Sequence, residues 1–199
     1  MQAILVIGTV LCDPITLDFQ TKVDHKNVDD NRMFRMRYIV DDQYFKDMDG
    51  DEATKPKPIF FYAGSQGDIW DFYGKSGFVT TALAKQYGAL VIYGEHRFFG
   101  ASFPIDKKYG PFEKGNNTLM TEDQTMADYV DLIRYIKTKY NAEDKAVIAF
   151  GGLYSGMLAA WSRMEYPHVF QGALASSAPL LYFANSTSAP EWRFAEIIS

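Results

Sequence analysis

The chain has 199 residues, of which 47% are hydrophobic and 16% aromatic. This composition fits one domain with a sizeable core and argues against disorder over most of the length. The formal net charge is −5 and no run of Lys and Arg forms a basic patch, which disfavours nucleic acid as a partner. The single cysteine, Cys12, cannot close a disulfide within the chain.

An apolar run from Ala3 to Cys12 is the first feature along the chain. It is too short to span a bilayer as a helix, and no later run approaches that length, so we expect no membrane span. The run resembles the apolar core of a signal peptide but lacks the usual preceding positive charge. This run is therefore expected either to belong to a signal peptide or leader at residues 1–18, or to form a first strand.

Alternating apolar residues at 34–40 predict a strand with one buried face. Four compact apolar runs predict further buried strands at 58–64, 89–97, 145–150 and 170–181. Helices are expected at 76–88, after a capping box that starts at Thr121, and at 156–166. This alternation predicts an α/β fold with a mostly parallel sheet, helices on both faces, and ligands at the carboxyl ends of the strands.

Two motif-like stretches fail the patterns that they suggest. Asp-Met-Asp-Gly at 47–50 resembles part of a calcium loop, but Phe45 stands where the first carboxylate should be. Gly-Lys-Ser at 74–76 invites a phosphate-loop reading, but Ile69 occupies the place of the required glycine. We therefore expect no metal and no cofactor.

The stretch AFGGLYSGM at 149–157 reads as a strand, a sharp turn and a helix. Hydrolases place a nucleophilic serine at such a turn, in the pattern Gly-x-Ser-x-Gly. Here the centre is Leu153, and the serine follows two residues later as Ser155. Gly151 and Gly152 would let strand and helix approach closely.

The same turn would supply hydrogen-bond donors for an oxyanion. The N–H of Tyr154 lies at the start of the predicted helix, where it can stabilise negative charge. A second donor is expected from the loop after the strand at 58–64, which nominates Gly64, Ser65 and Gln66.

Four ordered motifs make the chain resemble the prolyl-specific serine exopeptidases, the family of lysosomal Pro-X carboxypeptidase, dipeptidyl peptidase II and thymus-specific serine protease. The motifs are VDHKNVDDNRMFRMRYIVDDQYF, PIFFYAGSQGDIW, GALVIYGEHRFFGAS and FGGLYSGMLAAWSRMEYPHVFQGALASSAPL. The resemblance implies an α/β-hydrolase fold with an added helical domain. Residues 19–183 would then be the N-terminal part of the hydrolase domain, with its sheet incomplete at the C-terminus, and 184–199 the start of the helical domain. The family's substrates would be peptides with a proline near one terminus.

The departures from the family pattern concern the chemistry. Leu153 aligns with the family's nucleophile and has no hydroxyl, which excludes covalent catalysis at that position. Ser155 aligns with a glycine and is expected to serve close packing, although it is the candidate for a displaced nucleophile. The resemblance places the family's Asp and His after Ser199, and it suggests a structural pairing for His96. The flanking strand and helix should still impose a positive φ on Leu153.

Three functions remain open at this stage. In the first, the chain is an incomplete or divergent copy of a serine peptidase that cleaves next to proline. In the second, it is a non-catalytic relative that binds such peptides. In the third, it is a gene fragment. Asn116 and Asn185 each begin a triplet that matches the glycosylation acceptor pattern. Together with the apolar run at the N-terminus, they favour a secreted or lysosomal protein.

Overall fold

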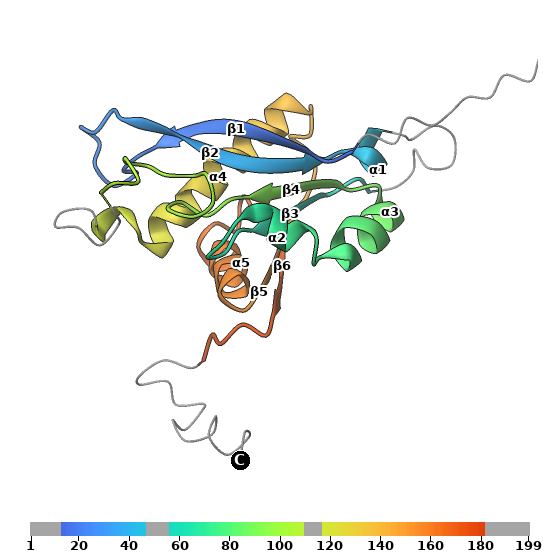
Figure 1. Cartoon of the computed structure of the whole chain (residues 1–199). Helices are drawn as coiled ribbons and strands as arrows, with labels where there is room; N and C mark the ends of the chain where they lie inside the picture. Colours follow the sequence, from blue (N-terminus) through green and yellow to red (C-terminus); the bar gives the residue numbers. More distant parts are fainter. Residues whose placement is uncertain (1–12, 47–55, 110–116, 182–199) are drawn as a thin grey trace, which may run out of the picture.

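The computed structural model describes residues 13–46, 56–109 and 117–181 (Figure 1). The apolar run at 3–12, Asn116, Asn185 and the segment 184–199 lie outside these ranges, so the expectations about them stay predictions. Among the described helices, none is both long enough and apolar enough to cross a membrane.

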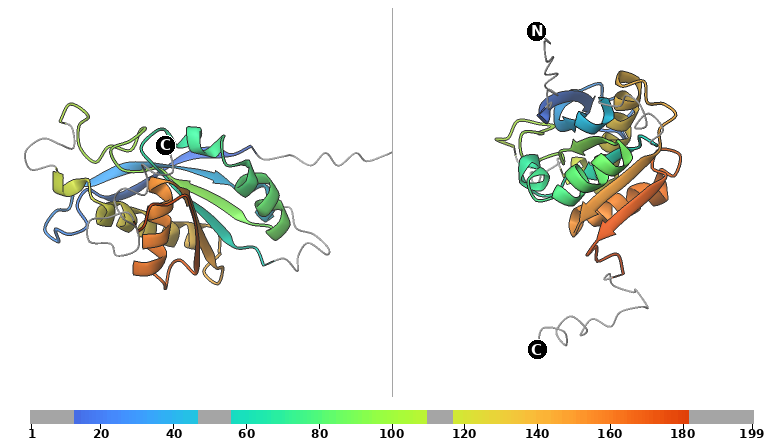
Figure 2. Two further views of the ribbon diagram at one scale, coloured as in Figure 1. Left: turned by 90° about the horizontal axis from the view of Figure 1, so that it is seen from below. Right: turned by 90° about the vertical axis from the view of Figure 1, so that its right-hand side faces the viewer.

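Six strands form one sheet in the order β1-β2-β4-β3-β5-β6 (Figures 1 and 2). Their bounds are β1 Ile15–Lys22, β2 Met33–Asp41, β3 Ile59–Ala63, β4 Leu90–Gly94, β5 Val147–Gly152 and β6 Gly172–Ser176. Strands β3, β4, β5 and β6 pair in parallel, whereas β2 is antiparallel to both β1 and β4. The predicted α/β fold with a mostly parallel sheet is confirmed.

Helices pack against both faces of this sheet. They are α1 Gln43–Lys46, α2 Ile69–Tyr73, the π-helix η2 Phe78–Leu83, α3 Ala84–Tyr87, the 3₁₀-helix η3 Asn117–Leu119, α4 Glu122–Lys139 and α5 Tyr154–Glu165. Successive side chains of a strand point to opposite faces. Accordingly, Phe60 of β3 packs with Ile69 and Val79, while Phe61 lies in the larger core cluster with Ile133 of α4 and Leu158 of α5.

Helix α4 begins at the predicted capping residue, but only half of the capping box forms. The Thr121 side chain accepts a hydrogen bond from the Gln124 N–H. The Gln124 side chain does not return this bond. Its oxygen accepts the His25 N–H at 2.8 Å, and its amide group donates to Asp24. The glutamine therefore ties the chain before β2 to the start of α4.

Three local features were not predicted from the sequence. Strand β1 begins at Ile15, inside the range considered as a leader, and its side chains are mostly exposed or half-buried, so its apolar periodicity is weak. Helix α2 has five residues, too few for a periodic signal. The predicted helix at 76–88 exists and ends at Gly88 with φ 64°, but most of it is π-helical.

The end of β4 is anchored by a buried ion pair between Arg97 and Asp128 of α4. The Arg97 Nε lies 2.7 Å from one carboxylate oxygen, and its Nη2 lies 2.8 Å from the other. Both side chains are fully buried. The remaining guanidinium N–H groups donate to the carbonyl oxygens of Lys22, Val23 and Leu119. Arg97 therefore holds the end of β1, η3 and α4 together at the carboxyl edge of the sheet.

We predict that Arg97→Met lowers the free energy of unfolding by about 3–5 kcal/mol, because it leaves the Asp128 charge buried without its partner. Urea denaturation measures this change. Arg35→Met is the matched control, since Arg35 pairs with Asp18 on the surface and should contribute little. An equal, small effect of both substitutions would contradict the assigned role of Arg97.

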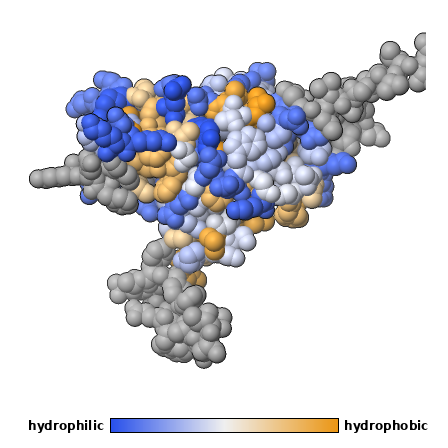
Figure 3. All heavy atoms as spheres, viewed as in Figure 1, coloured by the Kyte–Doolittle hydropathy of each residue, from blue (hydrophilic) through white to orange (hydrophobic). Residues whose placement is uncertain are grey.

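Strand β6 lies at the edge of the sheet and pairs only with β5 within the described part of the chain. It carries no charged residue, and its Leu174 is 46% exposed. Figure 3 shows hydrophobic residues at the surface of this lower region of the molecule. An uncharged, uncovered strand edge favours association.

We predict that the chain self-associates as its concentration rises, and that Leu174→Lys reduces this association. Size-exclusion chromatography with binding of a hydrophobic dye measures both effects. Val28→Lys introduces the same charge at an exposed apolar residue between β1 and β2, at the opposite end of the sheet, and should reduce association less. A sharp monomer peak without dye uptake at every concentration would contradict the prediction.

Candidate active site

The turn between β5 and α5 has the conformation expected for the nucleophile of a hydrolase. Leu153 adopts φ 55° and ψ −121°, and its side chain is 68% exposed. Its N–H donates to the Ser176 carbonyl oxygen of β6 at 3.0 Å, and its own carbonyl accepts the Met157 N–H of α5. The predicted positive φ is confirmed, so the turn keeps its shape although a leucine stands at its apex.

The glycines of the turn are not equivalent. A Cβ on Gly151 would lie 2.1 Å from the Ser155 carbonyl oxygen, so no side chain fits there. A Cβ on Gly152 would meet nothing closer than 3.8 Å, so the expected steric need for this glycine is not found. The sequence patterns did not single out Gly156, but a Cβ there would lie 3.1 Å from Ala178 and from the carbonyl oxygens of Gly151 and Ser176. Gly151 and Gly156 therefore permit the close approach of strand and helix.

Ser155 is buried and bonded to the turn itself. Its Oγ donates to the Gly152 carbonyl oxygen at 2.9 Å and accepts the Gly152 N–H at 3.0 Å. The side chain is 1% exposed. A hydroxyl engaged in this way cannot also attack a substrate at the apex, so the geometry favours the packing role over the displaced nucleophile.

The candidate oxyanion donors differ in availability. Tyr154 is the first residue of α5, and its N–H has no acceptor within the described ranges. The Gly64 N–H donates to the Gly94 carbonyl oxygen at 2.9 Å, which removes Gly64 from the candidates. The N–H groups of Ser65 and Gln66 have no acceptor among the described residues and remain proposed donors.

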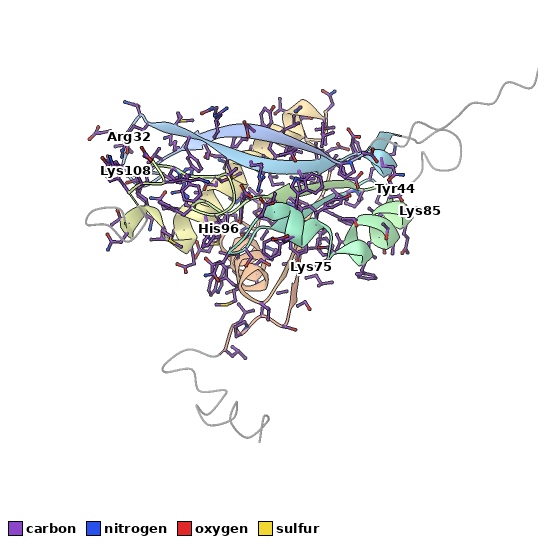
Figure 4. The ribbon with its side chains drawn as sticks, in the orientation of Figure 1. Arg32, Tyr44, Lys75, Lys85, His96 and Lys108 are labelled. Atoms are coloured by element: carbon purple, nitrogen blue, oxygen red, sulfur yellow. The ribbon has the colours of Figure 1, made fainter. Side chains whose placement is uncertain are left out.

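A cavity of about 250 Å³ adjoins the turn on the side of β6. Gly151 and Gly152 line it together with Tyr62, Phe150 and Leu174. The side chain of Lys75, which Figure 4 labels, also lines it and adds a positive charge. The cavity therefore offers apolar and aromatic walls beside the turn that carries Leu153.

His96, which Figure 4 labels, contacts Tyr154 at the start of α5 and is 2% exposed. Its Nδ1 is 2.6 Å from the Arg97 carbonyl oxygen, and its Nε2 is 3.1 Å from the Tyr154 hydroxyl. Burial lowers the pKa of His96 to about 4, so the ring is neutral near pH 7. The expected structural role of His96 is consistent with these contacts, although sequence reasoning did not find its partner Tyr154, which lies 58 residues away.

The other two histidines do not reach the turn through any described contact. The Nε2 of His25 is 2.7 Å from Asp128, and the exposed His168 packs its ring edge-on against Tyr166. Glu95, beside His96, is fully buried and binds Arg37 of β2, the Ser102 hydroxyl at 2.7 Å and the Ala101 N–H at 2.9 Å. Within the described ranges, no group of three or more His, Cys, Asp or Glu is placed to hold a metal ion.

Comparison with known proteins finds one family over most of the chain. A family model described as Serine carboxypeptidase S28 matches residues 21–197. Lysosomal Pro-X carboxypeptidase of Bos taurus is 43% identical over 165 residues, which cover 82% of this chain and 31% of that protein. Thymus-specific serine protease of Homo sapiens is 36% identical over 159 residues, 79% of this chain and 29% of that protein. The chain thus spans about a third of the length of these relatives.

A solved structure supports the fold. A Bacteroides ovatus protein assigned as a dipeptidyl aminopeptidase IV superposes with a TM-score of 0.56 over 83% of this chain and 21% of that chain. The sequences are 13% identical, so the likeness concerns the fold alone. It confirms the expected α/β-hydrolase type of architecture.

We predict that Leu153→Gly raises the free energy of unfolding by about 1 kcal/mol. Glycine relieves a backbone strain of about 1–3 kcal/mol and offsets part of this gain through its own flexibility. Leu153→Ala removes the same exposed side chain but keeps the Cβ, so it should change stability little. Thermal and urea denaturation compare the two variants, and equal stabilities would contradict a strained turn.

The low pKa of His96 predicts a loss of stability in acid. The unfolded chain takes up a proton on this ring near pH 6.5, whereas the folded chain does so only near pH 4. The contribution of the neutral His96 ring to the free energy of unfolding is therefore complete above pH 6.5. It declines by about 3 kcal/mol in total as the pH falls from 6.5 to 4. Urea denaturation along this pH range should show a flatter dependence for His96→Gln. His168→Gln is the control, and an unchanged slope in His96→Gln would refute the assignment.

Proposed function

Because the chain belongs to the serine carboxypeptidase S28 family, we propose that it binds proline-containing peptides on that family's scaffold without carrying out the nucleophilic step. The substrate class follows from the name Pro-X carboxypeptidase, which relatives at 41–43% identity carry. The lysosomal designation of these relatives also supports a lysosomal or secreted location for this chain.

The conformation and identity of Leu153 carry the proposal. The residue keeps the positive φ and the exposure that a nucleophile needs, but its side chain has no group that can attack a carbonyl carbon. Ser155 does not replace it, because its hydroxyl donates to the Gly152 carbonyl oxygen and accepts the Gly152 N–H. The turn is thus preserved as a structure, while its covalent chemistry is lost.

What remains at the turn suits peptide binding. The Tyr154 N–H has no acceptor among the described residues, so it can donate to a peptide carbonyl or to a terminal carboxylate. The neighbouring cavity offers Tyr62, Phe150 and Leu174 as walls for a pyrrolidine ring. Both features lie at the carboxyl ends of parallel strands, where ligands of such sheets bind.

A second candidate is a peptidase that becomes active once further chain is present. The intact geometry of the turn favours this alternative, because a turn under strain persists only where its surroundings impose it. In that case further chain supplies the catalytic Asp and His, and a residue other than Leu153 acts as the nucleophile. The two candidates differ in whether any hydrolysis is observed.

We predict that the chain binds acetyl-Pro-Phe weakly and does not hydrolyse it. Calorimetry measures binding, and chromatography of the released phenylalanine measures cleavage. Tyr62→Leu should weaken binding because it removes an aromatic wall of the cavity, whereas Tyr109→Leu, at a distant exposed tyrosine, should not.

Leu153→Ser alone should not restore family-level activity, since an oxyanion hole and binding without a working triad give only about 10³–10⁴ over water. Cleavage by the unmodified chain that Ser155→Ala abolishes would overturn the proposal. Absence of binding together with absence of cleavage would also overturn it and would leave the gene-fragment alternative.

A further inference from the structure

The His96 ring connects the end of β4 to the first residue of the helix that follows the turn. Its Nδ1 lies 2.6 Å from the carbonyl oxygen of Arg97, and its Nε2 lies 3.1 Å from the hydroxyl of Tyr154. The two rings also pack against each other, with centroids 5.6 Å apart. This contact joins segments that are otherwise separated in the sequence.

The surrounding groups determine which ring nitrogen carries the proton. A carbonyl oxygen can only accept, so the short contact to Arg97 requires the proton on Nδ1. Because the buried ring is neutral, its Nε2 is then a bare acceptor.

The hydroxyl that donates to Nε2 can also be identified. Thr125 lies 3.4 Å from Nε2, but its hydroxyl hydrogen is already donated to the Thr121 carbonyl oxygen at 3.0 Å. The Tyr154 hydroxyl is therefore the donor. Burial raises the pKa of Tyr154, which keeps this donor protonated.

We propose that His96 is a positioning residue of the site: as the Nδ1–H tautomer it accepts the Tyr154 hydroxyl and so holds the first turn of α5, which carries the Tyr154 N–H, against the end of β4. The functional consequence rests on the proposed peptide binding, whereas the tautomer and the hydrogen bond do not.

The other contacts of the turn show what this bond adds. Leu153 is held toward β6 through Ser176, and Ser155 is held toward β5 through Gly152. The Leu153 carbonyl oxygen accepts the Met157 N–H, which sets the peptide plane that carries the Tyr154 N–H. The side chain of Tyr154 is held by His96, which follows β4. The first turn of α5 is therefore tied to the end of β4, next to the Arg97–Asp128 pair.

The first test is nitrogen-15 NMR of the histidine side chains in the full chain. With three histidines, His25→Gln and His168→Gln assign the His96 signals by elimination. We expect His96 to show a protonated Nδ1 and a bare Nε2 at pH 7, and we expect Tyr154→Phe to shift the Nε2 signal, whereas Tyr109→Phe leaves it in place. A protonated Nε2, or an Nε2 signal that does not respond to Tyr154→Phe, would overturn the inference.

The second test measures binding of acetyl-Pro-Phe. Tyr154→Phe and His96→Gln should each weaken binding about fivefold, the value of one net hydrogen bond. The double variant should be no weaker than either single one, because both substitutions break the same bond. Tyr154→Phe keeps the ring and its packing, so it remains informative if His96→Gln folds poorly.

The outcomes separate the inference from the proposed function. Additive losses, or full binding by Tyr154→Phe, would refute the positioning role while leaving peptide binding intact. If the unmodified chain does not bind the peptide, the proposed function fails, and the tautomer and hydrogen bond are then judged by the NMR measurement alone.

Discussion

The guanidinium group of Arg97 lies where segments from distant parts of the sequence meet. It pairs with Asp128 of α4, and its other N–H groups bind the backbone after β1 and at η3. Such a buried pair is not a strong source of stability by itself, because both charges lose their hydration. Its importance lies in the cost of breaking it, since the remaining charge would stay buried without its oppositely charged partner. The path of the chain after β4 is therefore closely constrained.

The two residues before Arg97 bind other elements of the fold. Glu95 binds Arg37 of β2 and the turn at 101–102, and it accepts the N–H of Ile69 at the start of α2. His96 contacts Tyr154 at the start of α5. Three consecutive side chains at the end of one strand thus reach β2, α2, α4 and α5. The rim of the site is held by buried polar contacts that do not involve a nucleophile.

This arrangement explains how the turn at Leu153 keeps an unfavourable backbone conformation without a catalytic serine. The strain amounts to about 1–3 kcal/mol, and it persists only where neighbours determine the backbone on both sides. Here those neighbours are Ser176, Gly151 and the helix that His96 anchors. These interactions shape the turn without any contribution from a hydroxyl at its apex.

The sequence predicted the features that depend on local pattern. Strand β2 follows from alternation at 34–40, β3 from its compact apolar run, and α4 from its capping residue and apolar face. It did not predict β1, whose face is only partly buried, or the π-helical form of η2, which tertiary packing decides.

Within the site, the apex and Tyr154 could be located from the motif, because the motif encodes the turn. Which N–H groups are free could not be known, since the bond of Gly64 to Gly94 depends on the neighbouring strand. The contact between His96 and Tyr154 likewise depends on how the segment after β4 lies against the start of α5, and it has no local signal.

The most direct test of this account is the backbone angle of Leu153 in solution, measured by NMR couplings that report φ in the full chain. If buried contacts rather than catalysis shape the turn, Leu153 will show a positive φ near 55° without any ligand. A negative φ, typical of an ordinary strand or helix residue, would mean that the turn relaxes with a leucine at its apex and would contradict the account.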